Sequence, residues 1–214
     1  MSLNRGTPGA GVGGRMLSKR SDNAGQENAR GPHLETNPDD ALAEVSRTDW
    51  ELLAQLANRY RGPDDPETTA DAFKSSYVDA IREYQKNPVR AETPSTAAVS
   101  PLDTGCFKVS PFDIPVIDSV TITVEGVYCP GTAWVAEIFG SLKVAGSTVW
   151  KDTVELTPGH YSIRYQPDLK AAKADFTVGI FGNDHCLRIF GNACYWWGHW
   201  NCSKDFDTTV HCFG

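Results

Sequence analysis

The chain has 214 residues, of which 40% are apolar and 22% are charged, and its formal net charge is −7 at pH 7. This composition is ordinary for a globular protein and indicates neither a fibrous nor a membrane class, and the absence of any run of about 18 apolar residues predicts no transmembrane segment. The negative charge argues against electrostatic binding to nucleic acid or to anionic lipid.

Residues 1 to 40 are rich in glycine and contain no Phe, Tyr or Trp. Such a segment cannot bury enough apolar surface to offset the entropy lost on ordering, so we expect a flexible, disordered N-terminal arm. Its stretch GTPGAGVGGR is similar to a phosphate-binding loop but lacks the lysine, and no strand precedes it. The start of the chain also lacks the apolar stretch of a cleaved secretory signal.

Residues 41 to 90 carry helical periodicity. In TDWELLAQLANRYRG, Thr48 and Glu51 predict a capping box, and the Gly-Pro pair that follows predicts the end of the helix. A second helix is expected to begin with Asp65 as its cap and Pro66 at its first position, and to end before the next Asn-Pro pair. We therefore predict a helical hairpin.

The apolar stripe of this hairpin needs a cover. Trp50 and Leu53 in the first helix, and Phe73, Tyr77 and Ile81 in the second, recur at helical intervals. Two helices are too small to make a core of their own. We expect the stripe to pack on the second half of the chain, on another copy through residues 48–86, or on a partner.

Residues 91 to 104 are rich in Pro, Ser, Thr and Ala and predict a linker. Residues 105 to 214 contain short runs, such as SVTITVEGVY and ADFTVGIFG, that alternate or are enriched in β-branched and aromatic residues. Val120, Ile122 and Val124 should share one face of a strand. Six to eight strands at this spacing predict an antiparallel β-sandwich or a partly open barrel, so the fold class is mostly β.

All six cysteines lie in this half, at Cys106, Cys129, Cys186, Cys194, Cys202 and Cys212. An even number of cysteines predicts up to three disulfides, whose pairing cannot be chosen from the sequence. A zinc site is the alternative, but the last four cysteines lie eight, eight and ten residues apart. Structural zinc sites use ligand pairs about two to four residues apart.

The predicted disulfides imply an oxidising compartment, which conflicts with the missing signal. We expect an extracellular protein that is secreted by a route without a cleaved signal. A cytoplasmic protein is the alternative if the cysteines are reduced.

The stretch CYWWGHWNC places five aromatic or imidazole side chains between two cysteines. Neighbouring residues of a strand face opposite sides, so at least one of Trp196 and Trp197 should face solvent, a loop or a partner. An exposed tryptophan can stack on a sugar ring or lie among lipid headgroups. Alternatively, helices or a turn at Gly198 cover these rings. The predicted ligand-binding residues are Tyr195, Trp196, Trp197, His199 and Trp200.

No set of residues predicts a particular catalytic mechanism. The sequence has no GxSxG elbow, and the neighbouring cysteine and histidine residues would point apart on a strand. Asp184, Asp205 and Asp207 could hold a calcium ion, but a solvated edge explains them as well. We predict no cofactor and no metal, and the question of catalysis stays open, with the balance against it.

The function that this sequence favours is non-enzymatic recognition of a cell-surface or extracellular ligand, with carbohydrate as the leading class. A structural subunit or cargo of a large assembly is the first alternative, because of the helical stripe and the arm. A secreted toxin or effector without a cleaved signal peptide is the second.

Overall fold

The computed structural model describes residues 36–86, 97–117 and 119–214, all of which belong to one compact unit. Most of the predicted arm and the first part of the predicted linker lie outside the described residues. Among the described helices, none is both long and apolar enough to cross a membrane.

Three helices precede the sheets. The first was not predicted and begins within residues 1–40, which were expected to form a flexible arm, and the other two start at residues other than those predicted. The three helices are α1 (Pro38–Ala41), α2 (Arg47–Tyr60) and α3 (Ala70–Lys86). The capping box of α2 is made by Ser46 and Asp49 rather than by Thr48 and Glu51. The Ser46 hydroxyl accepts a hydrogen bond from the Asp49 N–H (3.2 Å), and the Asp49 carboxylate accepts one from the Ser46 N–H (2.9 Å). The same Ser/Thr-x-x-acid spacing occurs twice, two residues apart, and the first copy forms the cap.

The start of α3 is also later than predicted. The Thr69 hydroxyl accepts a hydrogen bond from the Ala72 N–H (3.2 Å), so Thr69 caps this helix in place of Asp65. Asp65 instead closes the turn between the helices, where its carboxylate accepts from the Gly62 N–H (2.8 Å). Short polar side chains stabilise turns as well as helix caps, which explains the error.

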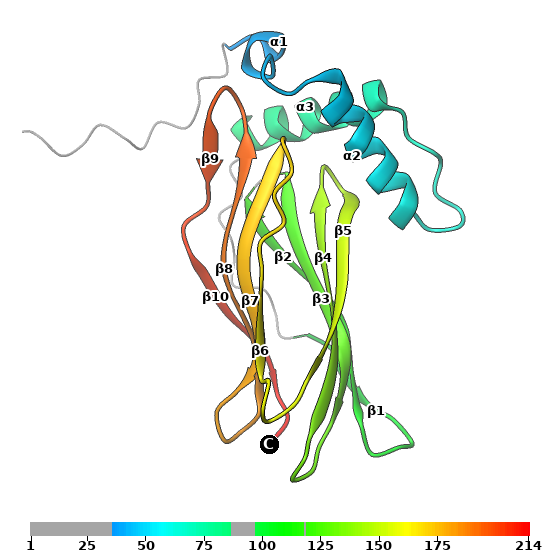
Figure 1. The fold of residues 1–214 in the computed structure, drawn as a ribbon, viewed down its shortest axis with the longest axis vertical. Helices are drawn as coiled ribbons and strands as arrows, with labels where there is room; N and C mark the ends of the chain where they lie inside the picture. Colours follow the sequence, from blue (N-terminus) through cyan, green and yellow to red (C-terminus); the bar gives the residue numbers. More distant parts are fainter. Residues whose placement is uncertain (1–35, 87–96, 118) are drawn as a thin grey trace, which may run out of the picture. The chain divides into compact units, whose positions relative to one another are not determined.

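The helical stripe packs on the chain's own sheets. Helices α2 and α3 lie across one end of the two sheets (Figure 1). Trp50 contacts Phe73 and Tyr77, with ring centroids 6.4 and 5.3 Å away. The Tyr77 hydroxyl lies 2.8 Å from the carbonyl oxygens of both Ala171 and Trp196, and it accepts a hydrogen bond from the Trp196 N–H (3.1 Å). Self-association through the hairpin remains a prediction, but it would have to use other residues.

Two antiparallel sheets form the sandwich that the sequence predicted. The first has the order β1-β2-β3-β4-β5, and the second has the order β10-β8-β7-β6 with β9 also paired to β8. The bounds are β1 (Val99–Pro101), β2 (Phe107–Ile117), β3 (Val120–Cys129), β4 (Val135–Val144), β5 (Ser147–Leu156), β6 (Ser162–Tyr165), β7 (Ala172–Phe181), β8 (Cys186–Trp196), β9 (Trp200–Cys202) and β10 (Phe206–Cys212). The structure thus places β1 within the segment predicted as a linker.

The core lies between the sheets and follows the alternation of the strands. Val120, Ile122 and Val124 are fully buried on β3, as predicted. The opposite sheet contributes Phe176 on β7, whose ring meets the edge of Trp150 from β5 at a centroid distance of 6.0 Å. The long strands therefore largely alternate between a buried row and an outward row.

All six cysteines form disulfides, and these are Cys106–Cys129, Cys186–Cys212 and Cys194–Cys202. The last two join residues directly opposite each other, from β8 to β10 and from β8 to β9. The disulfide prediction is confirmed, and neither zinc ligation nor reduced thiols describe these cysteines in the structure. Three disulfides indicate an oxidising environment such as the extracellular space.

Candidate ligand-binding face

The five predicted ligand-binding residues all lie in the β8–β9 hairpin, but the hairpin divides them between its two sides. Tyr195 and Trp197 are buried, with 1% and 3% of their surface exposed. Trp196 and Trp200 are half-buried, and His199 is exposed. Of the five, only the last three can meet a ligand without rearrangement of the hairpin.

The turn of this hairpin is held against the helices, which explains the buried tryptophan. Gly198 adopts a positive φ of 72°, which favours glycine. Its N–H donates to the carbonyl of Ala41 at the end of α1 (2.7 Å), and the Trp197 N–H donates to the His199 carbonyl (3.0 Å). The tight turn therefore directs Trp197 inward beneath α1.

The outward rings form what we call the tryptophan end, made of Lys173, Trp196 and Trp200. The two indoles meet edge to face at a centroid distance of 5.3 Å. The Lys173 ammonium from β7 reaches across β8 to lie 4.2 Å from the centroid of the Trp200 ring, a cation–π contact. The Cys194–Cys202 disulfide ties β9, which carries Trp200, to β8.

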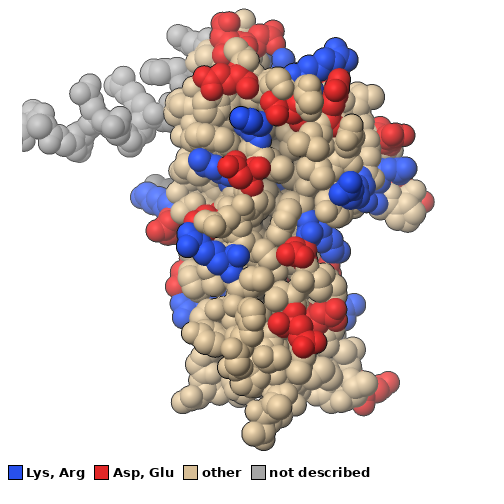
Figure 2. Space-filling model, in the orientation of Figure 1, with Lys and Arg blue, Asp and Glu red and all other residues tan. Residues whose placement is uncertain are grey.

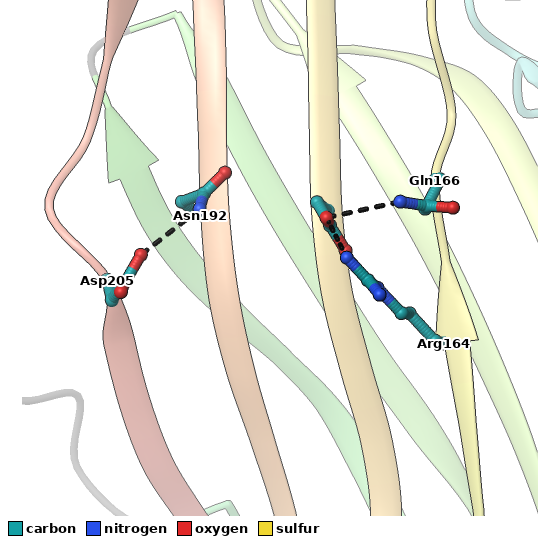
Figure 3. Close-up of polar contacts among 5 residues, drawn as sticks. Arg164, Gln166, Asn192 and Asp205 are labelled. Carbon is teal, nitrogen blue, oxygen red and sulfur yellow. Dashed lines mark hydrogen bonds and ion pairs between the residues drawn. The ribbon is translucent and has the colours of Figure 1, made fainter.

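Farther along the same face, five planar polar side chains from neighbouring strands and the residues beside them form two hydrogen-bonded groups, which together we call the polar cluster (Figure 3). Its members are Arg164, Gln166, Asp175, Asn192 and Asp205. Register explains the gathering, because Asp175 on β7 lies directly opposite Asn192 on β8. Outward residues of neighbouring strands at the same level must be neighbours.

Hydrogen bonds order the polar cluster. The Arg164 guanidinium binds the Asp175 carboxylate with both branches, one of them at 2.7 Å, and the Gln166 amide donates to the same carboxylate at 3.2 Å. The Asn192 amide donates to Asp205 at 3.1 Å. The Arg164 hydrogen bond holds the pKa of Asp175 below its ordinary value of 3.8, against a smaller opposing effect of burial. Asp175 is therefore an acceptor at neutral pH.

Several acceptor atoms of the cluster remain open to a ligand. In the part of the chain that the structure describes, the second carboxylate oxygen of Asp205 and the amide oxygens of Gln166 and Asn192 have no hydrogen-bond partner. These atoms can accept hydrogen bonds from hydroxyl or N–H groups of a bound molecule.

All members of the cluster except Gln166 line a groove of about 500 Å³ that crosses β6, β7, β8 and β10. Gly191 lies in its lining with a φ of 152°, and a Cβ atom there would lie 2.1 Å from the carbonyl oxygen of Asp175. The close approach of β7 and β8 at this level therefore requires glycine. The remaining lining residues are Phe176, Thr177, Phe190, Phe206 and Asp207.

Phe190 begins what we call the phenylalanine end of the face, made of Phe181 and Phe190. Their ring centroids are 5.9 Å apart. The Arg188 guanidinium lies 5.8 Å from the Phe181 ring and pairs with Asp207 on β10 at 2.6 Å. Aromatic rings therefore flank the polar cluster at both ends along β8.

The charges of this face balance. The cations around the groove and at the tryptophan end are Arg164, Lys173 and Arg188, and the anions are Asp175, Asp205 and Asp207. Both arginines are in ion pairs. In Figure 2, acidic and basic side chains are interspersed on the visible side of the molecule, without a broad basic patch. A face of this kind suits an uncharged polar ligand better than a polyanion.

The three aspartates considered for calcium do not meet. Asp184 lies in the β7–β8 turn, where its carbonyl accepts from the Gly214 N–H (3.0 Å), whereas Asp205 and Asp207 pair with Asn192 and Arg188. Within the described ranges, no group of three or more His, Cys, Asp or Glu side chains is placed to hold a metal ion.

A second aromatic cluster lies in the β-domain, where the β3–β4 connection, the β7–β8 turn and the C-terminal residues meet. Tyr128 hydrogen-bonds His185 and stacks on Phe213 at a centroid distance of 4.1 Å. Only 1% of the surface of Tyr128 is exposed, and burial raises its pKa. The Tyr128 ring packs in the core, so we assign this cluster a structural role.

Sequence reasoning missed most of the polar cluster and the phenylalanine end. Asp205 was considered only as a metal ligand, and Arg164, Asp175, Asn192 and Phe190 were not considered. A signal was present, because Asp175 and Thr177 alternate with residues that are buried in β7. Their outward direction could have been inferred, but the alignment of four strands at one level could not.

Comparison of the chain with protein-family models, with curated proteins and with solved structures finds no match. The function must therefore be inferred from the chemistry of the face itself.

Proposed function

We propose that this protein is a non-enzymatic, extracellular recognition protein that binds carbohydrate on the outer face of the second sheet. The observation that carries the proposal is the polar cluster, which lies in a groove between aromatic rings. Of the five ligand-contacting residues predicted from the sequence, the proposed site keeps Trp196, His199 and Trp200. It also includes the polar cluster and Phe190.

The side-chain types of the face fit a polyhydroxylated ligand. Amide, carboxylate and guanidinium groups can donate to and accept from adjacent hydroxyls in fixed planes. Aromatic rings offer large apolar surfaces, on which the C–H face of a sugar ring can pack. Ligand sites commonly combine such apolar contacts with a few ordered polar groups.

Charge and pKa favour binding over cleavage or nucleic-acid recognition. The balanced charges supply no net attraction for a phosphate backbone. A glycosidase needs one carboxyl group with a raised pKa to act as the general acid. Asp175 has the opposite shift, because Arg164 stabilises its ionised form.

The alternative of a structural subunit has less support than the sequence suggested. That alternative was based in part on the apolar stripe of the helices, and the largest side chains of the stripe are covered by the chain's own sheets.

The test is a panel of immobilised polysaccharides, followed by titration calorimetry on any sugar that binds. Asn192→Ala/Asp205→Ala removes one cross-strand pair from the groove and should weaken binding at least about tenfold, as expected when hydrogen bonds involving a charged group are lost. Asp113→Ala/Lys143→Ala removes a comparable pair from the first sheet (3.0 Å) and should leave affinity unchanged.

Both double variants change side chains that are exposed or half-buried at the surface, so both should remain folded. Failure of every polysaccharide to bind the wild-type protein would refute the proposal. Equal weakening by the two double variants would show that the groove is not the site.

A further inference from the structure

We infer that the ligand is an extended chain of linked sugars that lies along β8 and contacts both aromatic ends at once. This inference rests on the proposed function and specifies the class of carbohydrate. Its observation is separate, because it concerns the spacing of the two ends rather than the polar cluster between them.

The spacing follows from the strand. Trp196 and Phe190 are both outward residues of β8 and are six residues apart. At about 3.3 Å per residue, their backbones are roughly 20 Å apart. Asn192 of the polar cluster lies between them on the same row. A single sugar in the groove therefore cannot touch both ends.

The tryptophan end is held in place from three directions. The disulfide fixes β9 to β8, the Tyr77 hydroxyl binds the Trp196 backbone, and Lys173 covers part of the Trp200 ring. Such ordering reduces the entropy cost of binding at this end. Ordered side chains can also serve only to pack the fold. The Trp200 ring, however, is only half-buried, so part of it remains accessible to a ligand.

The phenylalanine end is ordered independently. Phe190 packs on Phe181, and the neighbouring Arg188 is held by Asp207. Neither end shares a contact with the other in the described part of the chain, so the two can contribute separately to affinity. Two separate contacts on one flexible chain raise its overall affinity above that of either contact alone.

The inference predicts a dependence on chain length. The probes are cello-, xylo-, manno- and chito-oligosaccharides of one to six units, titrated into the full-length protein. Affinity should rise with length in the series that binds and then reach a plateau. Trp200→Ala and Phe190→Ala should each weaken binding of the longest oligomer about tenfold, and Trp200→Ala should leave the affinity for the shortest unchanged.

Phe139→Ala is the matched control, because Phe139 is an outward ring of the first sheet that also lies near a lysine, at 5.8 Å from the Lys151 ammonium. It should change no affinity. Circular dichroism and the unfolding midpoint establish that each variant is folded.

The outcomes separate the two proposals. Binding that does not depend on length, and that responds to only one end, would overturn the extended-chain inference and leave the groove as a site for a short sugar. If no series binds and no polysaccharide binds, the carbohydrate function itself is wrong.

Discussion

The outer faces of the two sheets are both built from the outward rows of antiparallel strands, but they carry different types of residue. On the first sheet, the outward row carries a short ladder in which Thr123 and Lys143 both bind the Asp113 carboxylate. Lys151 pairs with Glu125 at 3.8 Å. Such Thr, Lys and Glu ladders are typical of solvated sheets.

The second sheet uses the same alternation to display different side chains. Its outward rows carry tryptophan and phenylalanine rings, and amide and guanidinium groups ordered around Asp175. Ion pairs occur on both faces, so ion pairing does not distinguish them. Both sheets alternate buried and outward residues, so this alternation does not identify the candidate site. The types of side chain in the outward rows do.

Removing disulfides should give the largest effects and should separate stability from binding. Cys106→Ser/Cys129→Ser opens a link with a sequence separation of 23 and should lower the free energy of unfolding by about 3 kcal/mol without affecting sugar binding. Cys194→Ser/Cys202→Ser opens a link with a separation of 8 and should cost less, about 2.5 kcal/mol. The second pair should nevertheless weaken binding, because it releases the strand that carries Trp200.

Urea unfolding measures the loss of stability in each variant, and calorimetric titration measures the loss of sugar affinity. If the Cys106/Cys129 variant weakened binding as much as the Cys194/Cys202 variant, the functional difference between the two faces would not hold.

Gly191→Ala should destabilise the protein about as much as loss of the Cys106–Cys129 disulfide. The new Cβ would lie 2.1 Å from the Asp175 carbonyl oxygen, so β7 and β8 must move apart. We expect a loss of about 3 kcal/mol in the free energy of unfolding. Gly140→Ala is the control from the first sheet, because its new methyl group would meet its nearest atoms at 3.7 Å, an ordinary contact. Equal thermal midpoints for the two variants would contradict the expected difference.

The pH dependence of binding should show the smallest effect. A carboxyl group with a folded-state pKa below 3.8 stabilises the folded state above its unfolded pKa, and this contribution is lost as pH falls through the folded value. Binding should therefore be constant from neutral pH down to about pH 4 and decline only below it. The Asp175 side chain is 36% exposed, so solvent screening keeps its effect on stability small.

Titrations between pH 7 and pH 3, with Asp175→Asn as the reference, test this expectation. A decline centred well above pH 4 would contradict this expectation.

The strand pattern and the cysteine count were enough to predict the sandwich and its disulfides. Alternation identified the inward row of β3 without reference to any other strand, because it depends only on local geometry. The pairing of Cys186 with Cys212 could not be predicted, because it depends on which strands are neighbours. The helix caps were misplaced for a local reason, since more than one short polar residue preceded each helix.

The candidate site was predicted only where it is local in sequence. The aromatic hairpin was found because its rings follow one another along the chain. Which of them face inward depends on how α1 receives the turn at Gly198. The polar cluster joins side chains from Arg164 to Asp205, and their proximity exists only after four strands align.

The single hydroxyl of Tyr77 has a consequence for cooperativity. It connects α3 to the beginning of β7 and the end of β8, through the Ala171 carbonyl and the Trp196 backbone. A truncated protein that began at residue 97 would leave these backbone groups without the Tyr77 hydroxyl and would uncover the apolar surface beneath the helices. Helices and sheets should therefore unfold in one transition, and the tryptophan end should lose its order in any fragment without α3.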